Sequence, residues 1–293
     1  MLFSLSILLK RIGLIYSLLT TKNILIICLL NIGLVNTLLA NQIGDTAPNF
    51  TAMTTKGEIN FHAWSNKKWV VLFSHPSDFT PVCTTELAQV AKLQPEFKKR
   101  NVKVIALSTD SLEDHNEWIP DINRYKDKIK EKNTLDKIIS NFSKNTDVNF
   151  PLISDEKFEV ASLYGMYHPK AEPSSGSFGN PSKATIRSVF IIDPSKKIQT
   201  ILVYPKNIGR NFDEIIRIVD ALQLSEKYKV STPANWQMGD PVIVSNDIAP
   251  ENIQEKFDTD GVIFFEDYLK MVDQPGYFGG SKEGKSRTKG NFK

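Results

Sequence analysis

Cys83 is the residue of this sequence best suited to covalent chemistry. It lies in the run HPSDFTPVCTTE at positions 75–86, and the second of the two cysteines, Cys28, lies in an apolar N-terminal stretch. No disulfide framework can therefore be drawn for the folded part of the chain. Because a single cysteine is about as often a buried apolar side chain as a nucleophile, its neighbours have to decide between the two roles.

The residues around Cys83 predict a strand, a loop and a helix. Residues 69–74 (WVVLFS) are apolar and rich in β-branched and aromatic side chains, which indicates a buried strand. Apolar residues then recur at helical spacing over 87–97, and Thr80 followed by Pro81 is a good helix start, with the threonine capping free amides. Cys83 would lie in the first helical turn, where the helix dipole and the unpaired amides favour a thiolate.

The loop resembles the active-site loop of the peroxiredoxins. The family's pattern of proline, threonine and cysteine is met by Pro76, Thr80 and Cys83. The amino-acid sequence of the loop is similar to that of the one-cysteine class, the peroxiredoxin six subgroup of the AhpC/TSA family. The resemblance extends from about residue 43 to about residue 265, through the segments NVKVIALS (101–108), YP (204–205), GRNFDE (209–214) and TPANW (232–236).

The resemblance implies a thiol peroxidase whose nucleophile is Cys83. A thiolate attacks one oxygen of a hydroperoxide, so the site needs a cation and hydrogen-bond donors for the charge that builds on the leaving oxygen. The family supplies an arginine on a later strand, which is matched by Arg187 in the segment ATIRSVFIID. By the same comparison, Thr80 hydrogen-bonds the sulfur or the peroxide, and Pro76 excludes water from the thiolate.

Three further residues match supporting positions of the family. Glu86 and Arg210 match residues that hold the active-site arginine through a second set of ion pairs, although a surface salt bridge would explain both nearly as well. His75 matches a histidine near the cysteine, where it would tune the thiolate or relay a proton. The resemblance implies no metal ion and no bound cofactor.

The product of the attack would be a sulfenic acid on Cys83, and the sequence offers no second cysteine toward the C-terminus to resolve it. An external reductant would therefore complete each turnover, and glutathione, ascorbate and a thioredoxin-like protein are the candidates. Hydrogen peroxide and organic hydroperoxides, including lipid hydroperoxides, are the expected substrates, in antioxidant defence and redox homeostasis. By family analogy we expect a homodimer.

Strand and helix signals alternate along the chain, which predicts an α/β fold. Further strands are expected at 102–108, 186–192 and 198–204, and further helices from 112, around 158–163 and over 212–222. The resemblance implies a thioredoxin-like fold over residues 41–224, a central mixed sheet flanked by helices. A small C-terminal α+β domain would follow over 225–270, and then a flexible tail over 271–293.

One segment departs from the family pattern. Residues 125–149 are rich in lysine and asparagine, are longer than the corresponding family connection, and carry apolar residues that suggest one amphipathic helix over 129–142. A tolerated surface insertion explains the segment best. An altered substrate access or oligomer surface is the alternative.

The first 40 residues have the pattern of a signal or targeting segment. They contain three basic residues, no acid and two apolar stretches, and they end in small residues at Ala40. We expect cleavage after Ala40 and export to a periplasm or the outside, or targeting to an organelle. An uncleaved segment would tie the protein to a membrane, and a mis-assigned start would leave the protein cytoplasmic.

Charge argues against a nucleic-acid partner. The net charge of +3 belongs to the leader, because the chain without its first 40 residues has 33 basic and 33 acidic residues. A protein that follows phosphates would carry a concentrated excess of lysine and arginine.

Two other functions stay open at this level. One is a cysteine hydrolase in which His75 or His115 activates Cys83, and hydrolysis without peroxide consumption would reveal it. The other is a non-catalytic oligomeric protein, a binding or chaperone protein on the same fold. The joint match at Pro76, Thr80, Cys83 and Arg187 favours the peroxidase over both.

Overall fold

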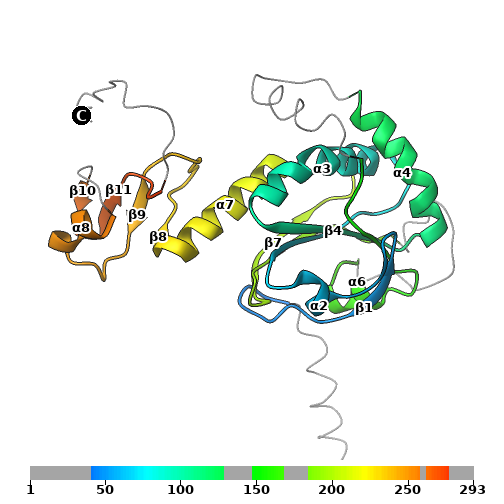
Figure 1. Cartoon of the computed structure of the whole chain (residues 1–293), viewed down its shortest axis with the longest axis horizontal. Coiled ribbons are helices and arrows are strands. Elements are labelled where there is room, and N and C mark those ends of the chain that lie inside the picture. Colours follow the sequence, from blue (N-terminus) through cyan, green and yellow to red (C-terminus); the bar gives the residue numbers. More distant parts are fainter. Residues whose placement is uncertain (1–40, 129–146, 168–183, 258–261, 277–293) are drawn as a thin grey trace, which may run out of the picture. The chain divides into compact units, whose positions relative to one another are not determined.

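The computed structural model describes residues 41–128, 147–167, 184–257 and 262–276, and these form two β-sheets with flanking helices (Figure 1). The larger sheet has seven strands in the order β2-β1-β5-β4-β3-β6-β7. Its strands are β1 (Thr51–Thr54), β2 (Gly57–Asn60), β3 (Trp69–Ser74), β4 (Val102–Ser108), β5 (Leu152–Ser154), β6 (Arg187–Ile192) and β7 (Ile198–Tyr204).

The seven-stranded sheet is mixed. Strands β3, β4 and β5 are parallel, and β6 runs antiparallel to β3 with Phe73 opposite Val189. Strand β7 continues the sheet antiparallel to β6. Because β3, β4 and β5 are parallel, the loops that follow them lie at the same end of the sheet, at the carboxyl ends of these strands.

Helices cover both faces of this sheet, and the alternation of side chains along the strands divides the core accordingly. Figure 1 shows α3 (Pro81–Lys99) and α4 (Leu112–Lys126) over one face, and α2 (Phe61–Ser65) and α6 (Glu159–Tyr164) over the other. Val71 and Phe73 of β3 pack with α3, α4 and α7 (Phe212–Tyr228), whereas Val70 and Leu72 pack toward α2 and α6.

A smaller four-stranded sheet forms in the C-terminal region. Its strands are antiparallel in the order β10-β11-β9-β8, namely β8 (Val230–Ser231), β9 (Val242–Val244), β10 (Val262–Glu266) and β11 (Leu269–Val272). The 3₁₀ turn η1 (Pro250–Asn252) and helix α8 (Ile253–Phe257) accompany it. A separate apolar cluster that includes Trp236, Ile253 and Val272 forms its core.

The observed architecture confirms the predicted fold class, a mixed α/β sheet flanked by helices with a small C-terminal α+β part. The predicted strands at 69–74, 102–108 and 198–204 have the observed bounds. The predicted helix over 129–142 lies outside the described residues. The predicted domain boundary between residues 224 and 225 falls inside α7, and it stays a prediction.

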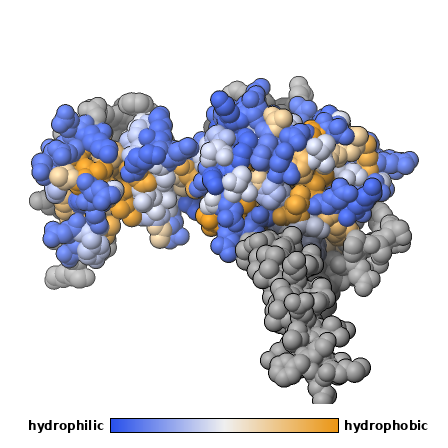
Figure 2. Space-filling view, turned by 90° about the horizontal axis from the view of Figure 1, so that it is seen from below, coloured by the Kyte–Doolittle hydropathy of each residue, from blue (hydrophilic) through white to orange (hydrophobic). Residues whose placement is uncertain are grey.

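On the face shown in Figure 2, hydrophilic residues cover most of the coloured surface, interrupted by smaller apolar patches. Within the described part of the chain, no helix has both the length and the apolar character needed to cross a bilayer. The apolar leader lies outside those residues.

Candidate active site

Cys83 is held in the first turn of α3, directly after the loop that leaves β3. Helix α3 begins at Pro81, with Thr80 as the N-cap residue in an extended conformation, and Cys83 is completely buried. The predicted capping contact is wrong in detail. The Thr80 hydroxyl donates to the carbonyl oxygen of Ser77 at 2.9 Å and caps no amide, because the tight loop brings that carbonyl within reach.

Arg187, the first residue of β6, brings a positive charge to the sulfur. Its Nη1 atom lies 3.3 Å from Cys83 Sγ and 2.6 Å from Glu86 Oε2, and its Nε donates to the carbonyl oxygen of Lys206 at 2.8 Å. The side chain is about 3% exposed. Three acceptors thus fix one guanidinium group against the thiol in a site without water access.

Glu86 lies one turn after Cys83 on the same helix face and binds both arginines. Its Oε2 accepts from Arg210 Nη2 at 2.6 Å as well as from Arg187, and its Oε1 accepts from Arg210 Nε at 2.9 Å and from the Arg210 amide at 2.8 Å. Both partners are buried. The surface salt bridge considered from the sequence is therefore wrong.

Arg210 ties this site to the sheet. Its Nη1 donates to the carbonyl oxygens of Ser74 at 2.8 Å and Ser188 at 3.1 Å, and its guanidinium lies over the Phe73 ring. Burial lowers the pKa of Arg210 and the charge of Glu86 opposes this shift, so the side chain stays a cation.

The charges of the site balance only if the sulfur is ionised. Two buried guanidinium groups face one buried carboxylate, which leaves one positive charge without a counter-ion. Buried charges are paired in native proteins because an unpaired one costs several kcal/mol. A Cys83 thiolate supplies the missing negative charge, and the geometry thus favours the reactive form of the residue.

The sequence profile of the AhpC/TSA family matches residues 43–201, and that of the C-terminal domain of 1-Cys peroxiredoxin matches residues 221–259. The chain belongs to the AhpC/TSA family and is a one-cysteine peroxiredoxin. It is a thiol peroxidase, an oxidoreductase of antioxidant defence. This assignment takes the place of the hydrolase and of the non-catalytic protein considered from the sequence.

Named relatives agree with this assignment over most of their length. A 1-Cys peroxiredoxin of Dictyostelium discoideum is 41% identical over 80% of this chain and 86% of the relative. Peroxiredoxin-6 of Homo sapiens is 45% identical over 80% and 97%. The solved structure of a yeast mitochondrial 1-Cys peroxiredoxin, studied for thiol resolution through the glutathione and thioredoxin systems, is 43% identical, has a TM-score of 0.66, and covers 79% of this chain and 99% of its own.

The structure of this peroxiredoxin also places the other residues expected at the site. Pro76 is buried in the loop, and Thr80 is partly exposed beside the start of α3. The described hydrogen bonds of the Thr80 hydroxyl run to Ser77 and not to the sulfur, so only its lone pairs are available to an incoming peroxide. His75 is fully buried and its amide donates to the Leu107 carbonyl oxygen.

Sequence reasoning missed Asp78, which the structure places between two histidines of the peroxiredoxin. His75 Nε2 and His115 Nδ1 each approach one of its carboxylate oxygens. Three such groups resemble a metal site in composition. Their facing atoms are already hydrogen-bonded to one another and sealed from solvent, so the geometry is that of a proton-sharing set. The signal in the sequence was an acid three residues after a histidine, in a loop beside a buried strand.

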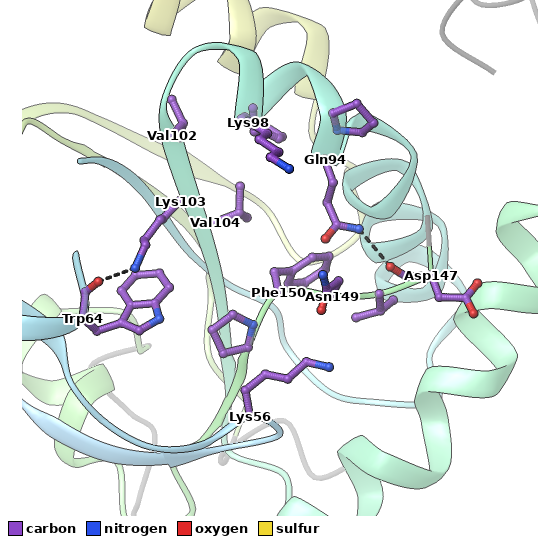
Figure 3. A pocket seen from close by; sticks show the side chains of 14 residues that line it. Lys56, Trp64, Gln94, Lys98, Val102, Lys103, Val104, Asp147, Asn149 and Phe150 are labelled. Carbon is purple, nitrogen blue, oxygen red and sulfur yellow. Dashed lines mark hydrogen bonds between the residues drawn. The ribbon is translucent and has the colours of Figure 1, made fainter. Parts of the chain in front are cut away.

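A groove of about 900 Å³ lies away from this chemistry (Figure 3). Its lining includes Lys56, Lys98 and Lys103, and it meets β4 at its first residues, Val102–Val104. The Cys83 loop follows the last residue of the neighbouring parallel strand β3. The groove therefore lies at the opposite end of the sheet, and no residue of the thiol site lines it.

Proposed function

We propose that this peroxiredoxin reduces hydrogen peroxide and organic hydroperoxides, lipid hydroperoxides included, through a sulfenic acid on Cys83. The observation that carries the proposal is the 3.3 Å contact between Arg187 Nη1 and Cys83 Sγ, in a site where that sulfur completes the charge balance. The same guanidinium lies close enough to stabilise negative charge on a leaving oxygen. Thr80 offers its hydroxyl oxygen to the peroxide, and His75 relays the proton.

The first experiment replaces the two cysteines separately in the full chain. Cys83→Ser should abolish peroxide consumption and thiol loss, because serine is not a nucleophile here, whereas Cys28→Ser should leave both unchanged. Rates with hydrogen peroxide, an alkyl hydroperoxide and a phospholipid hydroperoxide in micelles then rank the substrates. Peroxide turnover by Cys83→Ser would refute the mechanism.

We further propose that the reductant is external, since Cys83 is the single cysteine of the described residues. Glutathione with a thioredoxin-like protein is the system named for the yeast relative, which supports it over ascorbate here. The test oxidises the protein with one equivalent of peroxide and measures which of the three donors restores the Cys83 thiol. Restoration by ascorbate alone would contradict the proposal.

The assembly and location of the protein are proposals of the same kind. A homodimer is supported by family analogy, and sedimentation of the purified protein at micromolar concentration tests it. Export or organelle targeting is supported by the composition of residues 1–40. A mature protein that begins at Asn41 would agree with a cleaved leader, and one that retains Met1 would contradict it.

A further inference from the structure

The groove of Figure 3 follows a part of strand β4 that has a neighbouring strand on one side only. Strand β4 pairs with β3 from its first residue, Val102, onward. On its other side it pairs with β5 only from Ala106, because β5 begins at Leu152. Among the described residues, no strand lies beside residues 102–105 on that side. Residues 102–104 of this open edge line the groove (Figure 3).

The open edge leaves the backbone groups of Val104 without a partner. The Ala106 amide donates to the Pro151 carbonyl oxygen at 3.0 Å, and the Ser108 carbonyl oxygen accepts from the Asp155 amide at 2.9 Å. The backbone groups of successive residues alternate between the two sides of a strand, so the even-numbered residues of β4 point theirs toward the side of β5. The amide and the carbonyl oxygen of Val104 therefore point into the groove, where no described residue binds them.

Local features keep the chain before β5 from covering this edge. Pro151 has no amide hydrogen, so it cannot donate to β4 at the next position of the ladder. The Asp147 carbonyl oxygen accepts from Gln94 Nε2 of α3 at 3.0 Å, and the Val148 amide donates to Asn123 Oδ1 of α4 at 2.9 Å. The helices thus hold residues 147 and 148, and the edge of β4 stays open.

Lysine side chains surround the open edge. Lys56 and Lys98 are exposed and Lys103 is half-buried, and all three line the groove. Among the described residues that line it, the one acid is Asp147, whose carboxylate already binds Lys126 Nζ at 3.0 Å. The groove therefore carries an excess of positive charge.

Lys103 is itself a residue of the open edge. Its Nζ lies 4.5 Å from the centroid of the Trp64 ring and donates to the Trp64 carbonyl oxygen. Burial lowers the pKa of Lys103, and the positive charges of Lys68 and Lys196 lower it further. A carboxylate beside Lys103 would offset this repulsion between like charges.

We propose that the groove binds an extended, acidic segment of another protein, which adds to β4 as a further strand. The main chain of such a segment supplies a carbonyl oxygen for the Val104 amide and an amide for the Val104 carbonyl oxygen. Its acidic side chains pair with Lys103 across the two strands and with Lys98 near the end of α3. The proposal does not rest on the peroxidase mechanism, because no residue of the thiol site lines the groove.

Other occupants satisfy fewer of these groups. A fatty acid or another small organic acid pairs with the lysines, but an ionised carboxylate has no donor for the Val104 carbonyl oxygen. A second copy of the chain would bring the same lysines against Lys103, and charged residues on edge strands oppose such pairing. An acidic main chain is the occupant that meets both the charge and the open backbone groups.

Peptide binding to the full chain is the first test. The probe is a short fluorescein-labelled peptide of alternating valine and glutamate, and its binding is measured by fluorescence anisotropy. The same peptide methylated at its central amide nitrogens keeps its charge but loses main-chain donors, so we expect it to bind at least about fivefold more weakly. A peptide with lysine in place of glutamate should not bind. Absence of saturable binding by the acidic peptide, or equal binding by either comparison peptide, would overturn the proposal.

Amide hydrogen exchange in the wild-type protein locates the bound peptide. The Val104 amide should exchange more slowly in the complex. The Lys103 amide lies on the side of β3, as the bond from the His75 amide to the Leu107 carbonyl oxygen shows for the odd-numbered residues, so its exchange should not change. Slower exchange at neither residue, or equal slowing at both, would overturn the proposed pairing.

Charge reversal tests the part played by the lysines. Lys98→Glu and Lys103→Glu should each weaken binding of the acidic peptide at least about fivefold, because an attraction becomes a repulsion. Lys98 is exposed, so its variant answers the question even where Lys103→Glu fails to fold. The matched control is Lys157→Glu, an exposed lysine beyond the other end of β5, which should leave binding unchanged. Equal affinities of Lys98→Glu and Lys157→Glu would overturn the proposal.

Discussion

Replacing Arg187 by alanine should slow the oxidation of Cys83 without unfolding the protein. The change removes the hydrogen bond from Nη1 to Sγ, which is a charge-assisted bond in a buried site. Such bonds contribute about 1.5–3 kcal/mol, and each 1.36 kcal/mol is about tenfold in rate. We therefore expect the second-order rate constant to fall by roughly 10- to 150-fold. Arg210 still donates three hydrogen bonds to Glu86, so the carboxylate keeps a partner.

Stopped-flow tryptophan fluorescence is a suitable assay, because one of the four tryptophans, Trp118, donates a hydrogen bond from its indole nitrogen to Thr84, beside the reacting residue. The rate at increasing peroxide gives the second-order constant, and its pH dependence should extend to higher pH in the variant. The second-order rate constant of Arg187→Lys should lie between those of wild type and Arg187→Ala. One ammonium group cannot bind Sγ, Glu86 and the Lys206 carbonyl oxygen at the same time.

The control is Arg124→Ala, which removes an exposed arginine whose pair with Asp121 is 67% and 47% exposed. An exposed pair contributes about 0–1 kcal/mol, and this one is remote from the sulfur in sequence and in its contacts, so the rate should not change. An Arg187→Ala rate within twofold of wild type, with the same pH dependence, would refute the proposed role of the guanidinium.

Three further predictions concern stability. Glu86→Gln should lower the free energy of unfolding by about 3–5 kcal/mol, because it leaves one of two buried cations without a counter-ion. The partly exposed Glu214→Gln should cost less than about 1 kcal/mol, and equal losses in urea denaturation would contradict this. The pKa of Asp78 falls from 3.8 to about 2 on folding. Its contribution to the free energy of unfolding, roughly 2 kcal/mol, is therefore complete above about pH 4 and is lost as the pH falls toward 2. Asp78→Asn should remove this part of the pH dependence of stability. The pKa of His115 is raised above 6.5, because its bond to Asp78 outweighs burial, so its contribution is present below pH 6.5 and is lost as the pH rises through the folded value.

Local patterns were sufficient to predict the strand and helix that carry Cys83. The apolar run of β3 and the helical spacing of α3 are properties of neighbouring residues, and Pro81 marks the helix start. The partners of Cys83 could not be predicted from local patterns. Arg187 is 104 residues away from Cys83 along the chain, and its role beside the sulfur was predicted through the family resemblance, because no local pattern indicates which distant segments meet in the fold.

The details that sequence missed all depend on tertiary contacts. Thr80 was expected to cap the helix, but the folded loop offers its hydroxyl the Ser77 carbonyl oxygen. Asp78 looked like an ordinary loop acid, and its partner His115 lies 37 residues away on α4. Hydrogen-bond choices of this kind are settled by which groups the fold brings together, and composition and periodicity carry no information on them.

The balance of charges in the active site also has a consequence after the peroxide has reacted. Glu86, Arg187, Arg210 and the Cys83 thiolate cancel one another, but a neutral sulfenic acid leaves one positive charge uncompensated in a site closed to water. Such a charge costs several kcal/mol, and opening the first turn of α3 to solvent relieves that cost. We therefore expect oxidation to weaken the enclosure that protects the thiolate and to expose the sulfur to its reductant. The first turn of α3 would then open in each catalytic cycle once Cys83 is oxidised. Faster amide exchange at residues 81–86 in the oxidised protein would reveal this opening.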